Sequence, residues 1–144
     1  THIAVVKGEF SESDVVPVRV QASSTMRDLL CVQAGPDSAK RWNVSHVLNY
    51  FEREGKGVLV LLAADECEQS LERSIQIALG KADVPSPTTA GAQNVHLNYG
   101  IGSQILRHVG VSKMNVLGPD LKYKAISGFD LEIVGYIPQE TTSE

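Results

Sequence analysis

The fold of this chain is decided by residues 98–133, which read NYGIGSQILRHVGVSKMNVLGPDLKYKAISGFDLEI. Apolar residues in the first part recur at helical spacing, so we expect a helix with one buried stripe. That stripe is made of Ile101, Ile105, Leu106 and Val109. Gly110 follows it and is expected to end the helix in a left-handed turn, where a residue without a Cβ costs least.

The rest of this stretch alternates short strands with a short helix. Val116 and Leu117 predict a buried strand, and Gly118-Pro119 predicts the turn after it. Residues 121–127 are expected to form a helix that leads through Gly128 to a strand over residues 131–136. A helix–strand–helix–strand order favours strands covered by helices, so we expect an α/β domain with a mixed sheet flanked by helices.

Three more strands are predicted upstream. Residues 2–7 and 15–21 are rich in β-branched residues and are expected to pair with each other as a hairpin. Residues 58–62 form a continuous apolar run, which indicates a strand buried on both faces.

Helices are predicted between these strands. A stripe of Val44, Val47, Leu48 and Phe51 indicates a helix that stops at Gly55. Ser24 or Thr25 could cap a short helix with apolar residues Met26, Leu29 and Leu30. Another helix is expected to start at Asp65 or Glu66 and to end before Gly80. Residues 82–95 are expected to form a long loop. We expect one domain over residues 1–137 and a flexible tail over residues 138–144.

The composition is that of an ordinary globular domain. The chain has 144 residues, a net charge of -4 and two cysteines. The negative charge argues against a general nucleic-acid-binding surface. No apolar run reaches the roughly 20 residues of a membrane helix, and two cysteines make no disulfide scaffold. A cytoplasmic protein with reduced thiols is the simplest interpretation. Because the chain begins at Thr1 without an initiator Met or a signal peptide, we expect an excised domain.

Several stretches resemble a known family. Residues 99–107 (YGIGSQILR), 110–114 (GVSKM) and 128–134 (GFDLEIV) are similar to the C-terminal half of GTP cyclohydrolase II, an enzyme of riboflavin biosynthesis. Residues 2–8, 16–20 and 54–59 also resemble it. The resemblance implies a GTP cyclohydrolase II-like fold. In that family, a start like residues 1–8 often follows a 3,4-dihydroxy-2-butanone-4-phosphate synthase domain in a fused protein.

The metal site that the resemblance implies is not matched. In the family, three cysteines hold a zinc ion whose bound water is the nucleophile. Ser24 stands where the first cysteine is expected, and the Cys-x-Cys pair has no counterpart in residues 31–41. A neutral hydroxyl is a poor zinc ligand beside a thiolate. We expect no bound zinc and no other cofactor, and we expect Cys31 and Cys67 to be small buried apolar residues.

The catalytic positions that the resemblance implies are also replaced. Residues 63–68 lack the arginines that bind substrate in the family, and Ile77 stands in place of its tyrosine. Its Asp-x-Arg pair falls at Val95 and Leu97, and apolar side chains cannot transfer protons or form a covalent link to phosphate. We therefore expect no catalytic residue in this domain.

Three polar residues match substrate-binding or neighbouring positions of the family. They are Arg19, Asp28 and, with a gap of one residue, Lys122. They are candidates for binding a ligand, and the alternative is that they are surface charges. The glycines Gly100 and Gly102 are expected to permit close helix packing.

Two functions follow from these patterns. The first is a catalytically degenerate domain that serves a fused synthase as an oligomerisation or regulatory module, with the chain forming a homodimer and Val95 and Leu97 as candidates for its interface. The alternative is a domain that binds a GTP-like nucleotide, with residual or altered activity. Neither a nucleic acid nor a membrane is expected as a partner.

Overall fold

The computed structural model describes residues 1–32, 42–83, 92–118 and 130–139, with the backbone alone for residues 92–99. Their strands are β1 (Ile3–Lys7), β2 (Val15–Ala22), β3 (Gly57–Leu62), β4 (Lys113–Leu117) and β5 (Glu132–Ile137). The helices are η1 (Thr25–Leu29, a π-helical turn), α1 (Val44–Glu54), α2 (Glu68–Ala78) and α3 (Ala92–His108). None of these helices combines the length and apolar character of a membrane span.

The strands form one mixed sheet in the order β1-β3-β2-β4-β5. β1 is antiparallel to β3, whereas the pairs β3–β2, β2–β4 and β4–β5 are parallel. The mixed α/β fold predicted from the sequence is confirmed, but the predicted hairpin of β1 with β2 is wrong. β3 lies between them because all its side chains are apolar or absent, and such a strand is most stable inside a sheet covered on both faces.

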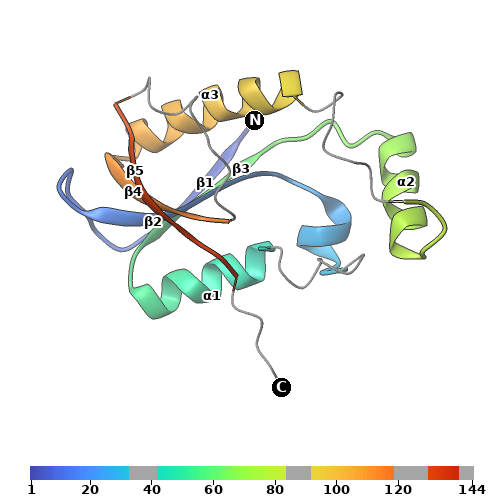
Figure 1. Cartoon of the computed structure of the whole chain (residues 1–144), viewed down its shortest axis with the longest axis horizontal. Helices are drawn as coiled ribbons and strands as arrows, with labels where there is room; N and C mark the ends of the chain where they lie inside the picture. The colour runs from blue at the N-terminus through green and yellow to red at the C-terminus, as the bar shows by residue number, and fades with distance from the viewer. Residues whose placement is uncertain (33–41, 84–91, 119–129, 140–144) are drawn as a thin grey trace.

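Helices cover the two faces of the sheet (Figure 1), with α3 on one side and α1 on the other. On the α3 side, buried residues of β2, β3 and β4 pack against Leu106 and Val111, with Ile101, Ile105 and Val109 partly buried beside them. On the α1 side, Val47 and Phe51 pack against Leu59, Leu117 and Trp42. The predicted stripes of both helices are therefore confirmed in the main, although Leu48 is 40% exposed.

Glycines act as predicted at the ends of these helices and at one close approach. Gly55 and Gly110 follow α1 and α3 with φ of 76° and 95°, in the left-handed region. A Cβ on Gly102 would lie 2.7 Å from Cγ1 of Val20, so this glycine lets α3 approach β2. Gly100 has no such neighbour within 4 Å, so close packing requires only Gly102.

Other local predictions need correction. The predicted loop over residues 82–95 is too long, because α3 already begins at Ala92. α2 begins at Glu68 rather than at Asp65 or Glu66. Ser24 does precede η1, but its side chain forms no capping hydrogen bond, and Leu29 and Leu30 are 75% and 58% exposed. The predicted helix over residues 121–127 and most of the predicted tail lie outside the described residues.

Candidate functional site

The parallel strands β2, β3 and β4 end on one side of the sheet, and a group of polar residues lies there. The end of β2 is tied to the end of β3, since Ser23 N donates to Leu62 O at 2.9 Å and Ala64 N donates to Ser23 Oγ at 3.4 Å. Ligands of open α/β sheets bind outside this edge. The candidate site therefore lies where η1 follows β2.

Arg19 connects β2 to the end of β4. Its Nε donates to Gln21 Oε1 at 2.9 Å, and its Nη1 donates to the Leu117 carbonyl oxygen at 2.8 Å. Gln21 is 6% exposed. The guanidinium group is thus held by the fold itself, and Gly118 allows it to come close, because a Cβ there would lie 2.9 Å from Arg19 Nη1.

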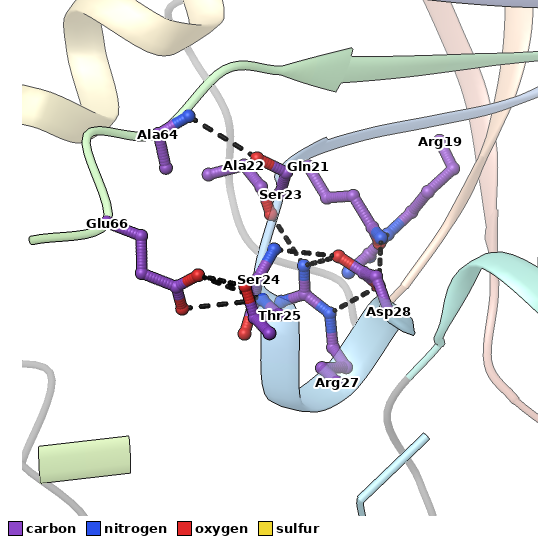
Figure 2. A network of polar contacts seen from close by, with 10 residues as sticks. All are labelled: Arg19, Gln21, Ala22, Ser23, Ser24, Thr25, Arg27, Asp28, Ala64 and Glu66. Atoms are coloured by element: carbon purple, nitrogen blue, oxygen red, sulfur yellow. Dashed lines mark hydrogen bonds and ion pairs between the residues drawn. The ribbon is translucent and has the colours of Figure 1, made fainter. Parts of the chain in front are cut away.

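Asp28 lies at the centre of this network (Figure 2). Its Oδ1 accepts from Gln21 Nε2 at 2.9 Å and from Arg27 Nε at 2.9 Å. Its Oδ2 accepts from Arg27 Nη2 at 2.6 Å and from Ser24 N at 3.0 Å. A carboxylate has about four acceptor sites, so these four donors use all of them. The carboxylate of Asp28 organises the start of η1.

Arg27 completes the network from the other side. Besides its ion pair with Asp28, its Nη2 donates to the Ala22 carbonyl oxygen at 2.5 Å. The side chain of Asp28 is 12% exposed and that of Arg27 is 31% exposed, so the pair is largely shielded from water. The guanidinium group of Arg27 therefore pairs directly with the carboxylate, whereas that of Arg19 is linked to it only through Gln21.

A second carboxylate, that of Glu66, fastens the segment after β3 to η1 (Figure 2). It accepts from Thr25 N at 3.3 and 3.2 Å and also from the Thr25 hydroxyl group. The sequence predicts a helix start at Asp65 or Glu66 and does not indicate this contact. No local pattern signals it, because the two residues are 41 positions apart.

The predicted ligand-binding residues are only partly brought together. Arg19 and Asp28 share the network through Gln21, whereas Lys122 lies outside the described residues. Ile77 lies half-buried on α2. Val95 and Leu97 lie on the backbone of α3, and their side chains are outside the described part of the chain.

The described residues around Ser24 do not fit a zinc ion. Ser24 occupies the position after β2, where its backbone N–H is used by Asp28. Among the described residues, no three His, Cys, Asp or Glu side chains are grouped so that they could hold a metal ion. Since the carboxylate of Asp28 is already saturated, it is not available as a ligand either.

The two cysteines are not buried, and that prediction was wrong. Cys31 and Cys67 are both free and exposed. Cys31 lies in a left-handed conformation, with φ of 53°, just after η1. Cys67 precedes α2, a helix that buries none of its residues. Hydrogen bonds from the backbone and side chain of Ser70 lower the pKa of the Cys67 thiol, because they favour the thiolate.

Comparisons with known proteins agree with this fold. The family model of GTP cyclohydrolase II matches residues 1–138. A 3,4-dihydroxy-2-butanone 4-phosphate synthase of Pseudomonas syringae is 35% identical over 139 residues, which are 95% of this chain and 36% of that protein. The riboflavin biosynthesis protein RibBA of Parabacteroides distasonis is 30% identical over 145 residues, covering 96% of this chain and 35% of that protein.

A solved structure is also similar. The crystal structure of RibBX, a two-domain 3,4-dihydroxy-2-butanone 4-phosphate synthase from A. baumannii, has a TM-score of 0.52 and 30% identity over 96% of this chain. The match covers 32% of that protein, so this chain spans about a third of the relatives it matches. The chain belongs to the GTP cyclohydrolase II family.

Proposed function

We propose that this chain is a catalytically degenerate GTP cyclohydrolase II-like domain of a riboflavin-biosynthesis protein. In this proposal it acts as an oligomerisation or regulatory module, as a homodimer, for a 3,4-dihydroxy-2-butanone-4-phosphate synthase domain fused upstream. The saturated carboxylate of Asp28, next to Ser24, is the observation that carries the proposal.

The polar network supports the loss of catalysis because it uses its own charges internally. Zinc sites in proteins are built from thiolates, imidazoles and carboxylates. Ser24 offers a neutral hydroxyl at the position expected for a thiolate. Asp28 would have to give up hydrogen bonds to ligate a metal, and bonds to a charged group each contribute about 1.5–3 kcal/mol. A zinc-bound water would therefore form only at the expense of the fold.

The names of the relatives support the fused partner. Two of the matched proteins carry the name of the synthase, and the segment similar to this chain is about a third of each. A domain whose ionisable groups hold one another is suited to a structural role, because burying a neutralised network against another domain costs less than burying free charges.

Two measurements test this function. Elemental analysis of the purified chain is expected to find no stoichiometric zinc after dialysis, and about one zinc per chain would contradict degeneracy. Light scattering at tens of micromolar is expected to give twice the 15.6 kDa mass of one chain. A monomer at tens of micromolar, together with an unchanged rate and oligomeric state of the parent synthase when residues 1–144 are deleted, would contradict the modular role.

A nucleotide-binding role is the second candidate, and the guanidinium groups of Arg19 and Arg27 favour it. They lie at the carboxyl ends of parallel strands, where anionic ligands of α/β sheets bind. A GTP-like ligand would have to compete with Asp28, Gln21 and the Leu117 carbonyl for these groups. Calorimetric titration with GTP tests this role. Saturable binding that is lost in the Arg19→Ala and Lys122→Ala variants would support it.

A further inference from the structure

β1 is an edge strand with exposed apolar residues. All five of its residues are exposed, among them Ile3 at 57%, Val5 at 37% and Val6 at 46%. Among the strands that the structure describes, β1 is the first in the sheet order, and none of them lies on its outer side. An exposed apolar edge strand presents unpaired backbone N–H and C=O groups to another chain, and proteins usually protect such edges.

Helix α1 extends this apolar edge on one face of the sheet. Lys7 Nζ lies 2.6 Å from Glu52 Oε2, so this flank of α1 lies over β1. α1 turns at Gly55 into β3 and so runs in the opposite direction to β3. Because β1 is also antiparallel to β3, α1 and β1 run in the same direction. Leu48 precedes Glu52 by four helical residues, about 6 Å, and Val5 precedes Lys7 by two strand residues, about 6.6 Å. The exposed Leu48 side chain therefore lies at the level of Val5.

The register places the apolar residues of this edge on the same face. Ile3 lies opposite Leu61 and Val5 lies opposite Leu59, and both leucines belong to the cluster that α1 covers. Ile3, Val5 and Leu48 thus form a ridge, which we call the β1 ridge. The ion pair of Lys7 with Glu52 closes it at one end. This pair leaves the ridge without net charge, although the whole chain carries -4.

The opposite edge of the sheet is protected, which sets β1 apart. The ladder of β4 with β5 is irregular between Met114 and Asn115. The pairing skips Val134 of β5, and such irregular pairing is a common way in which edge strands avoid further strands.

We infer that β1 pairs antiparallel with β1 of a second copy of this chain, so that two sheets join across a two-fold axis at Val5. This inference rests on the proposed homodimer and names its surface. A second copy fits because the β1 ridge is uncharged and identical copies do not repel there. The two-fold pairing also closes at a dimer, whereas pairing of β1 with β5 would continue into a filament.

The geometry of strands allows the two ridges to meet. Strands in a sheet are about 4.8 Å apart, so β3 and its copy would lie three spacings, or about 14 Å, from each other. Each α1 packs over its own β3, so the two α1 helices would be separated by a similar distance. Packed helices lie about 8–10 Å apart, and we expect the two Leu48 side chains to fill the difference. The strand edge and this helix flank form an interface at the low end of the size range, below about 1,200 Å². The dimer should therefore dissociate reversibly on dilution.

Two matched substitutions test this surface. Val5→Lys places like charges opposite each other across the two-fold axis, and Val134→Lys is the control because Val134 is a 54% exposed valine on the other edge strand. Sedimentation equilibrium should show a dimer for the wild type and for Val134→Lys, and at least a tenfold weaker dimer for Val5→Lys. Thermal melts followed by circular dichroism establish that both variants fold.

A cross-linking variant tests the same contact without adding charge. In a background with Cys31→Ser and Cys67→Ser, Val5→Cys should form an intermolecular disulfide on mild oxidation. Directly paired residues of antiparallel strands have Cα atoms about 4.5–5.5 Å apart, within the range for a disulfide. Val134→Cys in the same background should stay monomeric on a non-reducing gel.

The outcomes separate this inference from the proposed function. A wild-type dimer that Val5→Lys leaves intact, without the Val5→Cys disulfide, would overturn the β1 surface and leave the homodimer standing. The same holds if a dimer is lost only in Val134→Lys. A wild-type monomer at tens of micromolar would overturn both, and a mass beyond the dimer would overturn the closed two-fold pairing.

Discussion

Replacing Asp28 by Asn is expected to destabilise the chain, and the sign of the effect tests what this residue does. The carboxylate accepts four hydrogen bonds, two of them from Arg27. An amide in its place keeps one oxygen as acceptor and turns the other position into a donor, which then faces the donors Arg27 Nη2 and Ser24 N. The variant therefore loses the two charge-assisted hydrogen bonds of Oδ2, and its amide nitrogen faces these two donors without forming a hydrogen bond.

The size of the effect follows from burial. Removing one partner of a buried ion pair costs about 3–5 kcal/mol. The Arg27 side chain is 31% exposed, so water can hydrate the unpaired guanidinium group and reduce this cost. We therefore expect a loss of about 2–3 kcal/mol in the free energy of unfolding. For a domain of this size that is a fall of roughly 6–12 °C in Tm.

The assay is urea unfolding followed by circular dichroism, with Asp14→Asn as the matched control. Asp14 also accepts from a backbone N–H and a hydroxyl, both of Ser11, but it lies at the surface. Its substitution should cost much less than that of Asp28. If Asp28 instead served a ligand, its replacement would leave stability unchanged or raise it, because functional groups are commonly held at a cost to stability. A loss no larger than that of Asp14→Asn would refute the structural role of the network.

Three further predictions concern other parts of the chain. Glu66→Gln should weaken the contact with Thr25, so amide hydrogen exchange in α2 should quicken while exchange in β3 does not; equal protection in both proteins would contradict the role of Glu66. Gly102→Ala should cost about 1–3 kcal/mol because its Cβ would lie 2.7 Å from Val20 Cγ1, whereas Gly100→Ala should gain up to about 1 kcal/mol of helix stability; similar urea midpoints for the two variants would be evidence against this packing. In a Cys31→Ser background, alkylation of Cys67 should reach half its maximal rate at a lower pH in the folded chain than in urea, because Ser70 lowers the pKa of the folded thiol; coincident pH profiles would show that Ser70 has no such effect.

Local patterns in the sequence predicted most of the elements. The α1 stripe of Val47 and Phe51 and its stop at Gly55 were found because helix periodicity and a left-handed glycine are properties of neighbouring residues. The apolar run of β3 was found for the same reason. The partner of β1 was not, because strand pairing depends on which segment of the whole chain is most buried.

The site was predictable in its members but not in its contacts. Arg19 and Asp28 were selected by resemblance, and both lie at the carboxyl ends of the parallel strands. Arg19 donates to Gln21, and Asp28 accepts from Gln21 and Arg27. These hydrogen bonds depend on side-chain directions that no sequence pattern gives. The exposure of Cys67 was missed because a free thiol is usually a small buried group, while here it precedes a helix that packs only loosely against the rest of the chain.

Release of formate from GTP shows directly whether this domain has lost the chemistry of its family. The chain, supplied with zinc and magnesium, is assayed beside a buffer control and beside the Arg19→Ala variant, which separates an activity of this site from a contaminating enzyme. We expect no formate above the buffer control. Metal-dependent formate release that Arg19→Ala abolishes would contradict the account, because it would show that this domain still performs the chemistry of its family.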